Sequence, residues 1–297
     1  MAAKTANYGP FFVAMEKGYF AEQGIEIDIL AAAGGVSTPA LISGTLPYST
    51  SSDSALSAII KGAPLRVVYT NQDRNTQEVW ARPDISKLQD LKGKTIGLAT
   101  RGDSNEVSTR LLLTQNGVDP DSVSYTALGA GSAPAAALQG GSVAAAVISV
   151  ADALQIQKGK VQLHKLADFH DIRVAYVGMA TSATEIQQNP ERLTRILRGV
   201  AKGREYYKAF KAQTVQILGK YSGFPQDANE LDYQTILAAM TPEGSVPTDV
   251  QRADVDGRAQ LLKVPTDKIP PLANIYSYGA IMDVYKELKA SGWKPQP

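Results

Sequence analysis

The run LRVVYT (Leu65–Thr70) decides the fold class of this 297-residue chain. It is rich in apolar and β-branched residues, which is typical of a strand buried on both faces of a parallel sheet. Gly62 and Pro64 break the chain just before it, after a helical pattern over Ser52–Lys61. The short run YST (Tyr48–Thr50) precedes that helix and has strand character. Strands that alternate with helices in this way predict an α/β fold.

The same alternation extends towards the start of the chain. Residues 8–23 place aromatic and apolar side chains at helical spacing around Pro10, which suits the first turn of a helix. EIDIL (Glu26–Leu30) alternates like a strand, and a short helix capped by Ser37 and Thr38 is expected after it. The first part of the chain is therefore expected to form one α/β unit.

A second α/β unit is expected after Leu91. The predicted elements are strands over 94–99, 123–128 and 144–149 and helices over 104–115 and 134–139. Glycine pairs at one common offset link the two units, namely Gly34 with Gly131, Gly44 with Gly141 and Gly62 with Gly159. Beyond Ala183 the pattern is mostly helical.

These patterns predict two related lobes, each a mainly parallel sheet flanked by helices. Lobe I is expected to comprise residues 1–82 and 180–297, and lobe II residues 83–179. The chain is expected to cross between the lobes at hinges near residues 78–82 and 174–180.

Composition and charge exclude several classes of protein. The 30 basic and 29 acidic residues leave a net charge of +1, which gives no uniform field for nucleic acid or an anionic membrane. The chain contains no cysteine, so thiol catalysis, thiolate metal sites and disulfides are excluded. His164 and His170 are the only histidines, and neither an acidic cluster nor a GxSxG turn accompanies them. We therefore predict a protein without catalytic residues, metal or cofactor.

Several stretches resemble one known family. PFFVAMEKGYFAEQGIEIDIL (Pro10–Leu30) is similar to the opening helix and second strand of nitrate-, sulfonate- and taurine-type solute-binding proteins of ABC transporters. The resemblance continues in register through AAGGVSTPALISG, YSTSSDSALSAIIKGAPLRVV, DLKGKTIGL and AALQGGSVAAAVIS, and later through EIQQNPERLTRIL. It is strongest before Gly159 and weakens after about Phe210. The family's first strand is not recognisable upstream of Asn7, and GTLPYS stands where the family commonly has an acidic residue.

This resemblance implies a two-lobed periplasmic binding-protein fold of type II. It implies an extracytoplasmic solute-binding protein of an ABC importer, which closes on a small molecule and presents it to a permease. We accordingly expect a monomeric protein in the periplasm whose export signal has been removed and which meets the membrane only through the permease. No run of the chain approaches the roughly 18 to 20 apolar residues that a membrane span requires.

Small polar residues stand where predicted strands pass into predicted helices. Helix starts offer free amides and a positive dipole end, which attract anions, although ordinary helix capping explains the same residues. The candidate ligand-binding residues are Ser37, Thr38, Ser51, Ser52, Asp53, Ser104, Asn105, Ser132, Ser149 and Tyr176, with Asn7, Tyr8, Asn71 and Arg74 lining the rim. The expected solute is an anion of the sulfonate, nitrate or carboxylate type.

Other functions fit parts of the sequence. LGAGSAP (Leu128–Pro134) partly imitates a dinucleotide-binding turn, but a proline stands at its third glycine position. A lyase-type enzyme on the same fold, as in menaquinone or thiamine-precursor biosynthesis, is the alternative function. An effector domain of a transcription regulator would need a helix-turn-helix, which this chain lacks.

Overall fold

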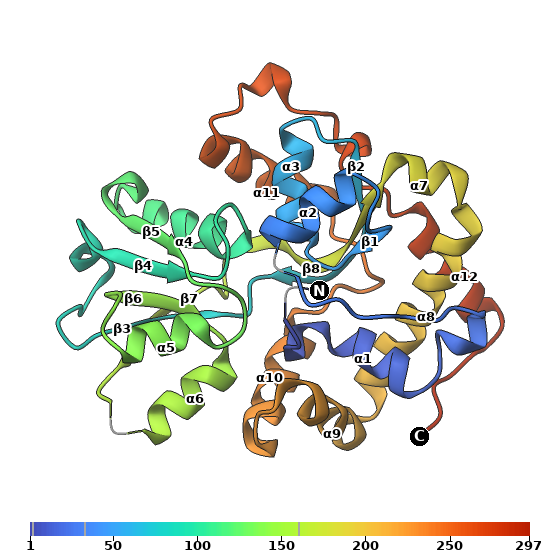
Figure 1. The fold of residues 1–297 in the computed structure, drawn as a ribbon, viewed down its shortest axis with the longest axis horizontal. Coiled ribbons are helices and arrows are strands. Elements are labelled where there is room, and N and C mark those ends of the chain that lie inside the picture. The colour runs from blue at the N-terminus through green and yellow to red at the C-terminus, as the bar shows by residue number, and fades with distance from the viewer. Residues whose placement is uncertain (2, 33, 160) are drawn as a thin grey trace.

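The computed structural model describes residues 1, 3–32, 34–159 and 161–297, which form two β-sheets flanked by helices (Figure 1). The strands are β1 (Tyr48–Ser49), β2 (Leu65–Arg74), β3 (Glu78–Ala81), β4 (Thr95–Leu98), β5 (Ser124–Ala127), β6 (Ala145–Ile148), β7 (His164–Asp168) and β8 (Arg173–Ser182). The α-helices are α1 (Gly9–Glu16), α2 (Gly34–Ile42), α3 (Ser52–Ile60), α4 (Ser104–Gln115), α5 (Ala133–Gln139), α6 (Val150–Lys158), α7 (Ala183–Gln188), α8 (Pro190–Ala209), α9 (Lys211–Ser222), α10 (Gln226–Ala239), α11 (Thr248–Leu262) and α12 (Gly279–Ala290). Short 3₁₀ helices include η1 (Ala6–Tyr8) and η2 (Ala21–Gln23).

The larger sheet has five strands in the order β5-β4-β6-β3-β7. β4 runs parallel to β5 and β6, as the alternation of strands and helices predicts, and α4, α5 and α6 surround this part (Figure 1). β3 and β7 run antiparallel to their neighbours. The sheet is therefore mixed, and the prediction of a mainly parallel sheet is right only for its β5-β4-β6 half.

The smaller sheet has three strands in the order β1-β8-β2, and every pair in it is antiparallel. The prediction of a mainly parallel sheet is wrong here. β8 returns from the larger sheet and runs between β1 and β2, so its direction opposes both. β2 itself is almost wholly buried, as its apolar run predicts.

The chain crosses between the sheets earlier than predicted. β2 in the smaller sheet is followed after residues 75–77 by β3 in the larger one, and β7 is followed after residues 169–172 by β8 in the smaller one. The predicted crossovers at 78–82 and 174–180 instead lie largely in β3 and wholly in β8, because strand character does not reveal which sheet a strand joins. Below, lobe I denotes residues 1–74 and 173–297, and lobe II residues 78–168.

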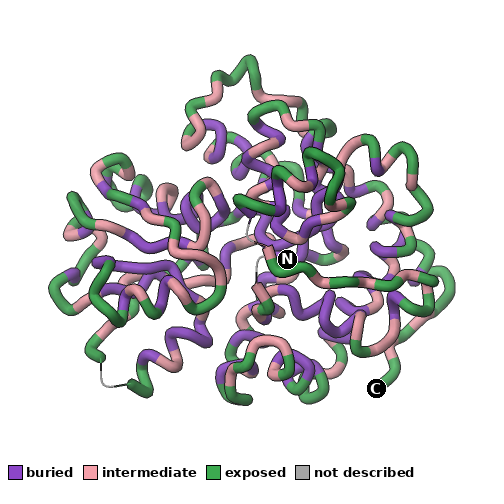
Figure 2. The backbone as a smooth tube through the Cα atoms, viewed as in Figure 1, coloured by how far each residue is buried: buried purple, intermediate pink, exposed green. Residues whose placement is uncertain are grey.

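The later helices build most of lobe I around its small sheet. α1 packs against α8 and α9, α12 packs against α8, and α3 and α11 flank β8. α10 lies at the boundary and contacts α6 of lobe II. Figure 2 shows buried backbone in both lobes, with the exposed residues concentrated on the turns and outer helix faces. Of the described helices, none is long and apolar enough to cross a membrane.

The opening segment departs from the prediction in two ways. The helix expected over residues 8–23 ends at Glu16, and Gly18, with φ of 72°, begins the turn that leads to η2. Residues 26–30 form no strand, although Ile27 and Ile29 are partly buried against the core and their neighbours are exposed. The alternation thus predicted the burial correctly, but no neighbouring strand completes a ladder. Within the described part of the chain, no strand precedes Asn7.

Candidate functional site

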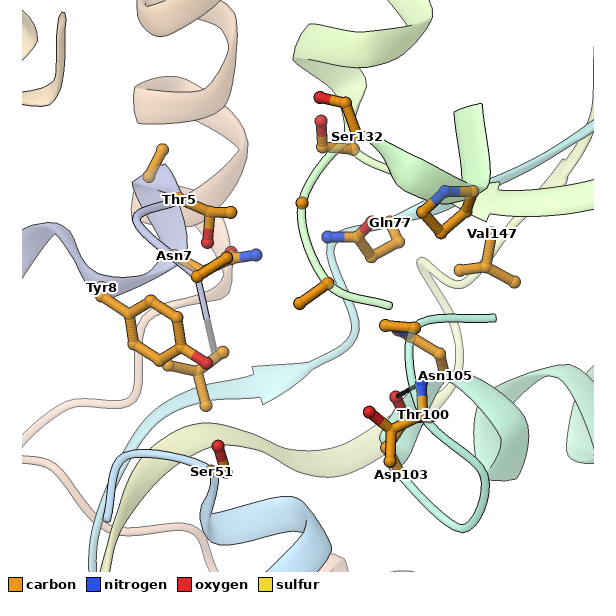
Figure 3. Close-up of a pocket in the computed structure, with 18 of the residues that line it drawn as sticks. Thr5, Asn7, Tyr8, Ser51, Gln77, Thr100, Asp103, Asn105, Ser132 and Val147 are labelled. Carbon is orange, nitrogen blue, oxygen red and sulfur yellow. Dashed lines mark hydrogen bonds between the residues drawn. The ribbon is translucent and has the colours of Figure 1, made fainter. Parts of the chain in front are cut away.

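The candidate site is a cleft of about 230 Å³ between the two lobes. Lobe I contributes the segment through Tyr8, the start of α3 and part of β8, while lobe II contributes the turns that follow β4, β5 and β6. Figure 3 shows Thr5 and Asn7 on one side of the cleft and Asn105 and Ser132 on the other. A small molecule in this cleft would contact both lobes.

Most of the predicted ligand-binding residues lie in this cleft. They are Asn7, Tyr8, Ser51, Asp53, Asn105, Ser132, Ser149 and Tyr176. The parallel strands β4, β5 and β6 end at the same edge of their sheet, and the residues that follow them therefore gather there.

The other predicted residues lie outside the cleft lining. They are Ser37, Thr38, Ser52, Asn71, Arg74 and Ser104. Ser37 and Thr38 are inside α2 and do not cap it, because the helix already includes Gly34. The Ser37 hydroxyl accepts a hydrogen bond from Ser49, and Ser52 is buried as the first residue of α3.

Two of these residues, Asn71 and Arg74, contact other protein side chains. Asn71 lies in β2, where its Oδ1 accepts hydrogen bonds from Tyr69 Oη at 2.7 Å and from Arg204 Nε at 3.3 Å. Arg74 ends β2, pairs with its neighbour Asp73 and lines a separate hollow. The sequence pattern identified the ends of the elements, but it did not show which side each residue faces.

The hydroxyl of Ser104 is hydrogen-bonded to an arginine of the other lobe. Its Oγ accepts a hydrogen bond of 2.6 Å from Arg258 Nη2 on α11, and both residues are fully buried. Arg258 also pairs with Asp254 at 2.8 Å. Ser104 therefore joins the lobes and is not available to a ligand.

One pair of aspartates lies at the starts of α3 and α4. Asp103 is the N-cap of α4, and its carboxylate accepts hydrogen bonds from the backbone amides of Thr100 and Glu106, each at 3.1 Å. Asp53 in the first turn of α3 accepts a longer one, 3.4 Å, from the amide of Ser104. Burial, and then the nearby charge of Asp53, raise the pKa of Asp103 to about 8.

A second pair of aspartates lies at the start of α6. Ser149 caps this helix and donates from its hydroxyl to Asp152 at 2.6 Å. Asp232 on α10 of lobe I lies near the backbone amide of Ala151 across the boundary between the lobes. Burial, and then the charge of Asp152, raise the pKa of Asp232 to about 7.

The titratable side chains of the cleft lining are predominantly acidic. Asp53, Asp103, Asp152 and Asp232 all border it, and Lys4, which is exposed, is the one basic side chain among the described residues of the lining. The amides at the starts of α4 and α6 are already paired with protein carboxylates and hydroxyls. The arrangement therefore favours a solute that donates hydrogen bonds over an oxyanion.

The sequence analysis missed three of the four aspartates. Asp103 stands directly before the predicted pair Ser104 and Asn105, and aspartate is a preferred N-cap, so a capping argument would have found it. Asp152 follows the predicted Ser149 by three residues. Asp232 has no local signal, because α10 reaches the cleft only through tertiary packing. No group of acidic or histidine side chains suited to a metal ion occurs among the described residues.

Comparison with known proteins identifies this arrangement. The fold matches the alkanesulfonate-binding protein SsuA of Xanthomonas axonopodis pv. citri bound to MOPS, with a TM-score of 0.73, 16% identity and coverage of 92% of this chain and 96% of that one. It also matches the periplasmic nitrate-binding protein NrtA of Synechocystis, with a TM-score of 0.66, 16% identity and coverage of 90% and 89%. Two sheets joined by two crossing segments around a cleft thus define a periplasmic binding-protein fold of type II.

The chain belongs to the NMT1/THI5-like family, whose model matches residues 5–211. A curated relative is the riboflavin-binding protein RibY of Chloroflexus aurantiacus, 27% identical over 207 residues. That match covers 66% of this chain and 58% of the relative, so it spans less than two thirds of the relative's length. The predicted family and fold are confirmed.

Proposed function

We propose that this protein is the solute-binding component of an ABC importer and encloses a small molecule between its lobes. The observation that carries the proposal is the cleft, to which both lobes contribute polar side chains. Relative motion of the lobes about residues 75–77 and 169–172 would open and close it. The protein would act as a monomer outside the cytoplasmic membrane and deliver its solute to a permease.

The solute would carry several hydrogen-bond donors and no oxyanion. Asp103 keeps its proton at neutral pH because its pKa is about 8, but the charge of Asp53 beside it would still repel a sulfonate, nitrate or carboxylate placed between the two side chains. The lining therefore argues against the anionic solute that the sequence predicted. Tyr8, Tyr176 and Phe224 provide apolar ring surface in the same cleft.

Riboflavin is the first uncharged solute to test. RibY is named as a riboflavin-binding protein. Riboflavin combines a flat ring system with an imide N–H and side-chain hydroxyls, which suit aromatic walls and carboxylate acceptors.

Binding without turnover is also part of the proposal. The relatives described above are binding proteins by name. Each solute that binds should be recovered unchanged after incubation with the protein, as chromatography would show. A product that forms with wild type and disappears with one substitution in the cleft would support the lyase-type alternative instead.

Native mass spectrometry of freshly purified protein, followed by calorimetry with the solute found and with riboflavin, tests the proposal. Ser132→Trp should abolish binding, because Ser132 is exposed in the cleft and a large ring there would fill it. Ser142→Trp is the matched control, because Ser142 is also exposed in lobe II but lies outside the lining. If Ser132→Trp binds as well as wild type does, the cleft is not the binding site.

A further inference from the structure

We propose that Asp53 and Asp103 form a subsite for a positively charged group of the solute, such as a protonated amine or an amidinium-like nitrogen heterocycle. The inference rests on the proposed function, since it names the charge of the solute that the cleft would enclose. Asp53 comes from the first turn of α3 in lobe I and Asp103 from the N-cap of α4 in lobe II. A cation between the two carboxylates would therefore hold both lobes together.

The charges around this pair do not neutralise it. Arg258 is the nearest cation, but its guanidinium is paired with Asp254 and donates to Ser104 Oγ and to the backbone oxygen of Asp53. Glu106 on α4 is separately paired with Arg101 and Arg110. Asp254 also acts on Asp53 but is paired with Arg258, and Tyr8 and Tyr176 place phenols in the same cleft. Burial, and then Asp53 and Asp103, raise the pKa of Tyr176 well above its ordinary value, so this phenol is uncharged. The net charge of the subsite is thus negative, and a bound cation would balance it.

An unsatisfied hydroxyl beside the pair independently indicates a ligand. Ser51 is only 1% exposed, and its Oγ has no hydrogen-bond partner. Figure 3 shows this hydroxyl directed towards the cleft. Because a buried hydroxyl without a partner costs free energy, a donor or acceptor on the solute would complete the site. The buried ring of Tyr176 adds an aromatic surface that suits a cation.

Binding of a cation should release a proton. Without a cation, one carboxyl of the pair retains its proton at neutral pH, since Asp103 has a pKa of about 8. A bound cation favours the ionised form, so the proton passes from Asp103 to the buffer. The affinity for a cation should therefore rise with pH up to about 8 and level off above it.

Benzamidine, benzamide and benzoate provide the test, because they share one shape and differ in charge. Calorimetry at pH 7 should give affinities in the order benzamidinium, benzamide, benzoate. Measurements in phosphate and in Tris should show release of up to about one proton with benzamidinium and none with benzamide. Equal affinities, a preference for benzamide, or no benzamidine binding would overturn the subsite.

Two substitutions assign the effect to this pair. Asp53→Asn and Asp103→Asn should each weaken benzamidine binding by at least about tenfold and leave benzamide binding unchanged. Asparagine preserves the cap of α4, so Asp103→Asn should still fold. Asp171→Asn, at a side chain 94% exposed, is the matched control and should change neither affinity. If the natural solute binds equally to wild type and to Asp53→Asn, the proposed function stands and the cation subsite is wrong. If no solute of any charge binds, the proposed function itself fails.

Discussion

Arg258 Nη2 on α11 donates a hydrogen bond of 2.6 Å to Ser104 Oγ at the start of α4, and so links the two lobes through a fully buried contact. Arg258 also reaches the backbone oxygen of Gly102 in lobe II at 3.3 Å. The lobes are therefore held together here by a buried charged side chain whose Nε, Nη1 and Nη2 each donate to protein atoms.

Ser104→Ala is expected to reduce stability but not solute binding. The substitution removes one partner of a buried guanidinium, which should cost about 1.5–3 kcal/mol in the free energy of unfolding. Urea denaturation measures this cost, and calorimetry should show an unchanged affinity for the solute. Ser132→Ala is the control for stability and should leave the free energy of unfolding unchanged, because that hydroxyl makes no cap hydrogen bond and faces the cleft. A large loss of affinity in Ser104→Ala with unchanged stability would restore Ser104 as a ligand contact.

Asp232→Asn is expected to stabilise the protein at high pH. Because the folded-state pKa of Asp232 is about 7 and lies above its usual value, the folded state binds its proton more tightly than the unfolded state does. The free energy of unfolding should therefore fall as pH rises from about 4 to 7, and then stay level with respect to this group. Asparagine does not titrate, so the variant should not lose this stability. Its free energy of unfolding should exceed that of wild type by at least about 1 kcal/mol at pH 8 and equal it near pH 4. Urea denaturation of both proteins across this pH range tests the expectation. If the free energy of unfolding changes with pH in the same way in both proteins, the expectation is wrong.

Gly203→Ala should destabilise the contact between α1 and α8. A Cβ on Gly203 would lie 2.3 Å from the backbone oxygen of Pro10 and 2.8 Å from Ala14 Cβ, so the two helices would have to separate. The expected loss is about 2–3 kcal/mol in thermal or urea unfolding. Gly219→Ala in α9 is the matched control, since its Cβ would meet only Asn229 Nδ2 at 3.7 Å. That variant should gain about 0.5–1 kcal/mol from the better helix former.

Arg204→Lys should be strongly destabilising although it keeps the charge. The buried guanidinium of Arg204 donates to Tyr285 Oη and Pro242 O, each at 3.0 Å, and to Asn71 and Thr241. An ammonium group cannot reach these divergent acceptors together, so we expect a loss of about 3 kcal/mol. Arg198→Lys on the same helix, which pairs with Glu287 at the surface, should change stability by less than about 0.5 kcal/mol. Similar losses in both variants would show that the buried hydrogen bonds are not the cause.

Most elements of the fold follow from local sequence patterns. The helix over Ser104–Gln115 agrees with α4 at both ends, because a polar start and a helical apolar spacing coincide there. LRVVYT lies in β2, whose burial its composition predicts. By contrast, the membership of β3 and β8 in different sheets depends on tertiary pairing, so the hinge positions could not be derived from strand character alone.

The candidate site was predictable in position but not in charge. Asn105, Ser132 and Ser149 were predicted from the turns that follow the parallel strands, because the common direction of these strands places the turns at one edge of the sheet. The charge of the cleft depends on which amides at the helix starts are hydrogen-bonded to the protein's own side chains. At the start of α6 this charge depends on Asp232, which belongs to a helix more than seventy residues further along the chain. No local sequence pattern predicts such a contact.

The insertion of lobe II between β2 and β8 also affects how the chain can fold. β8 pairs with β2 in a register that joins Leu65 to Ser182, so the smaller sheet cannot form until the whole of lobe II has been synthesised. The loop-closure entropy for that pairing would be large if the intervening chain were a coil. In lobe II, however, Glu78 pairs with Asp168 at the two ends of the inserted segment. If lobe II folds first, it brings the ends of β2 and β8 together, and the last long-range pairing then has to close only a few residues.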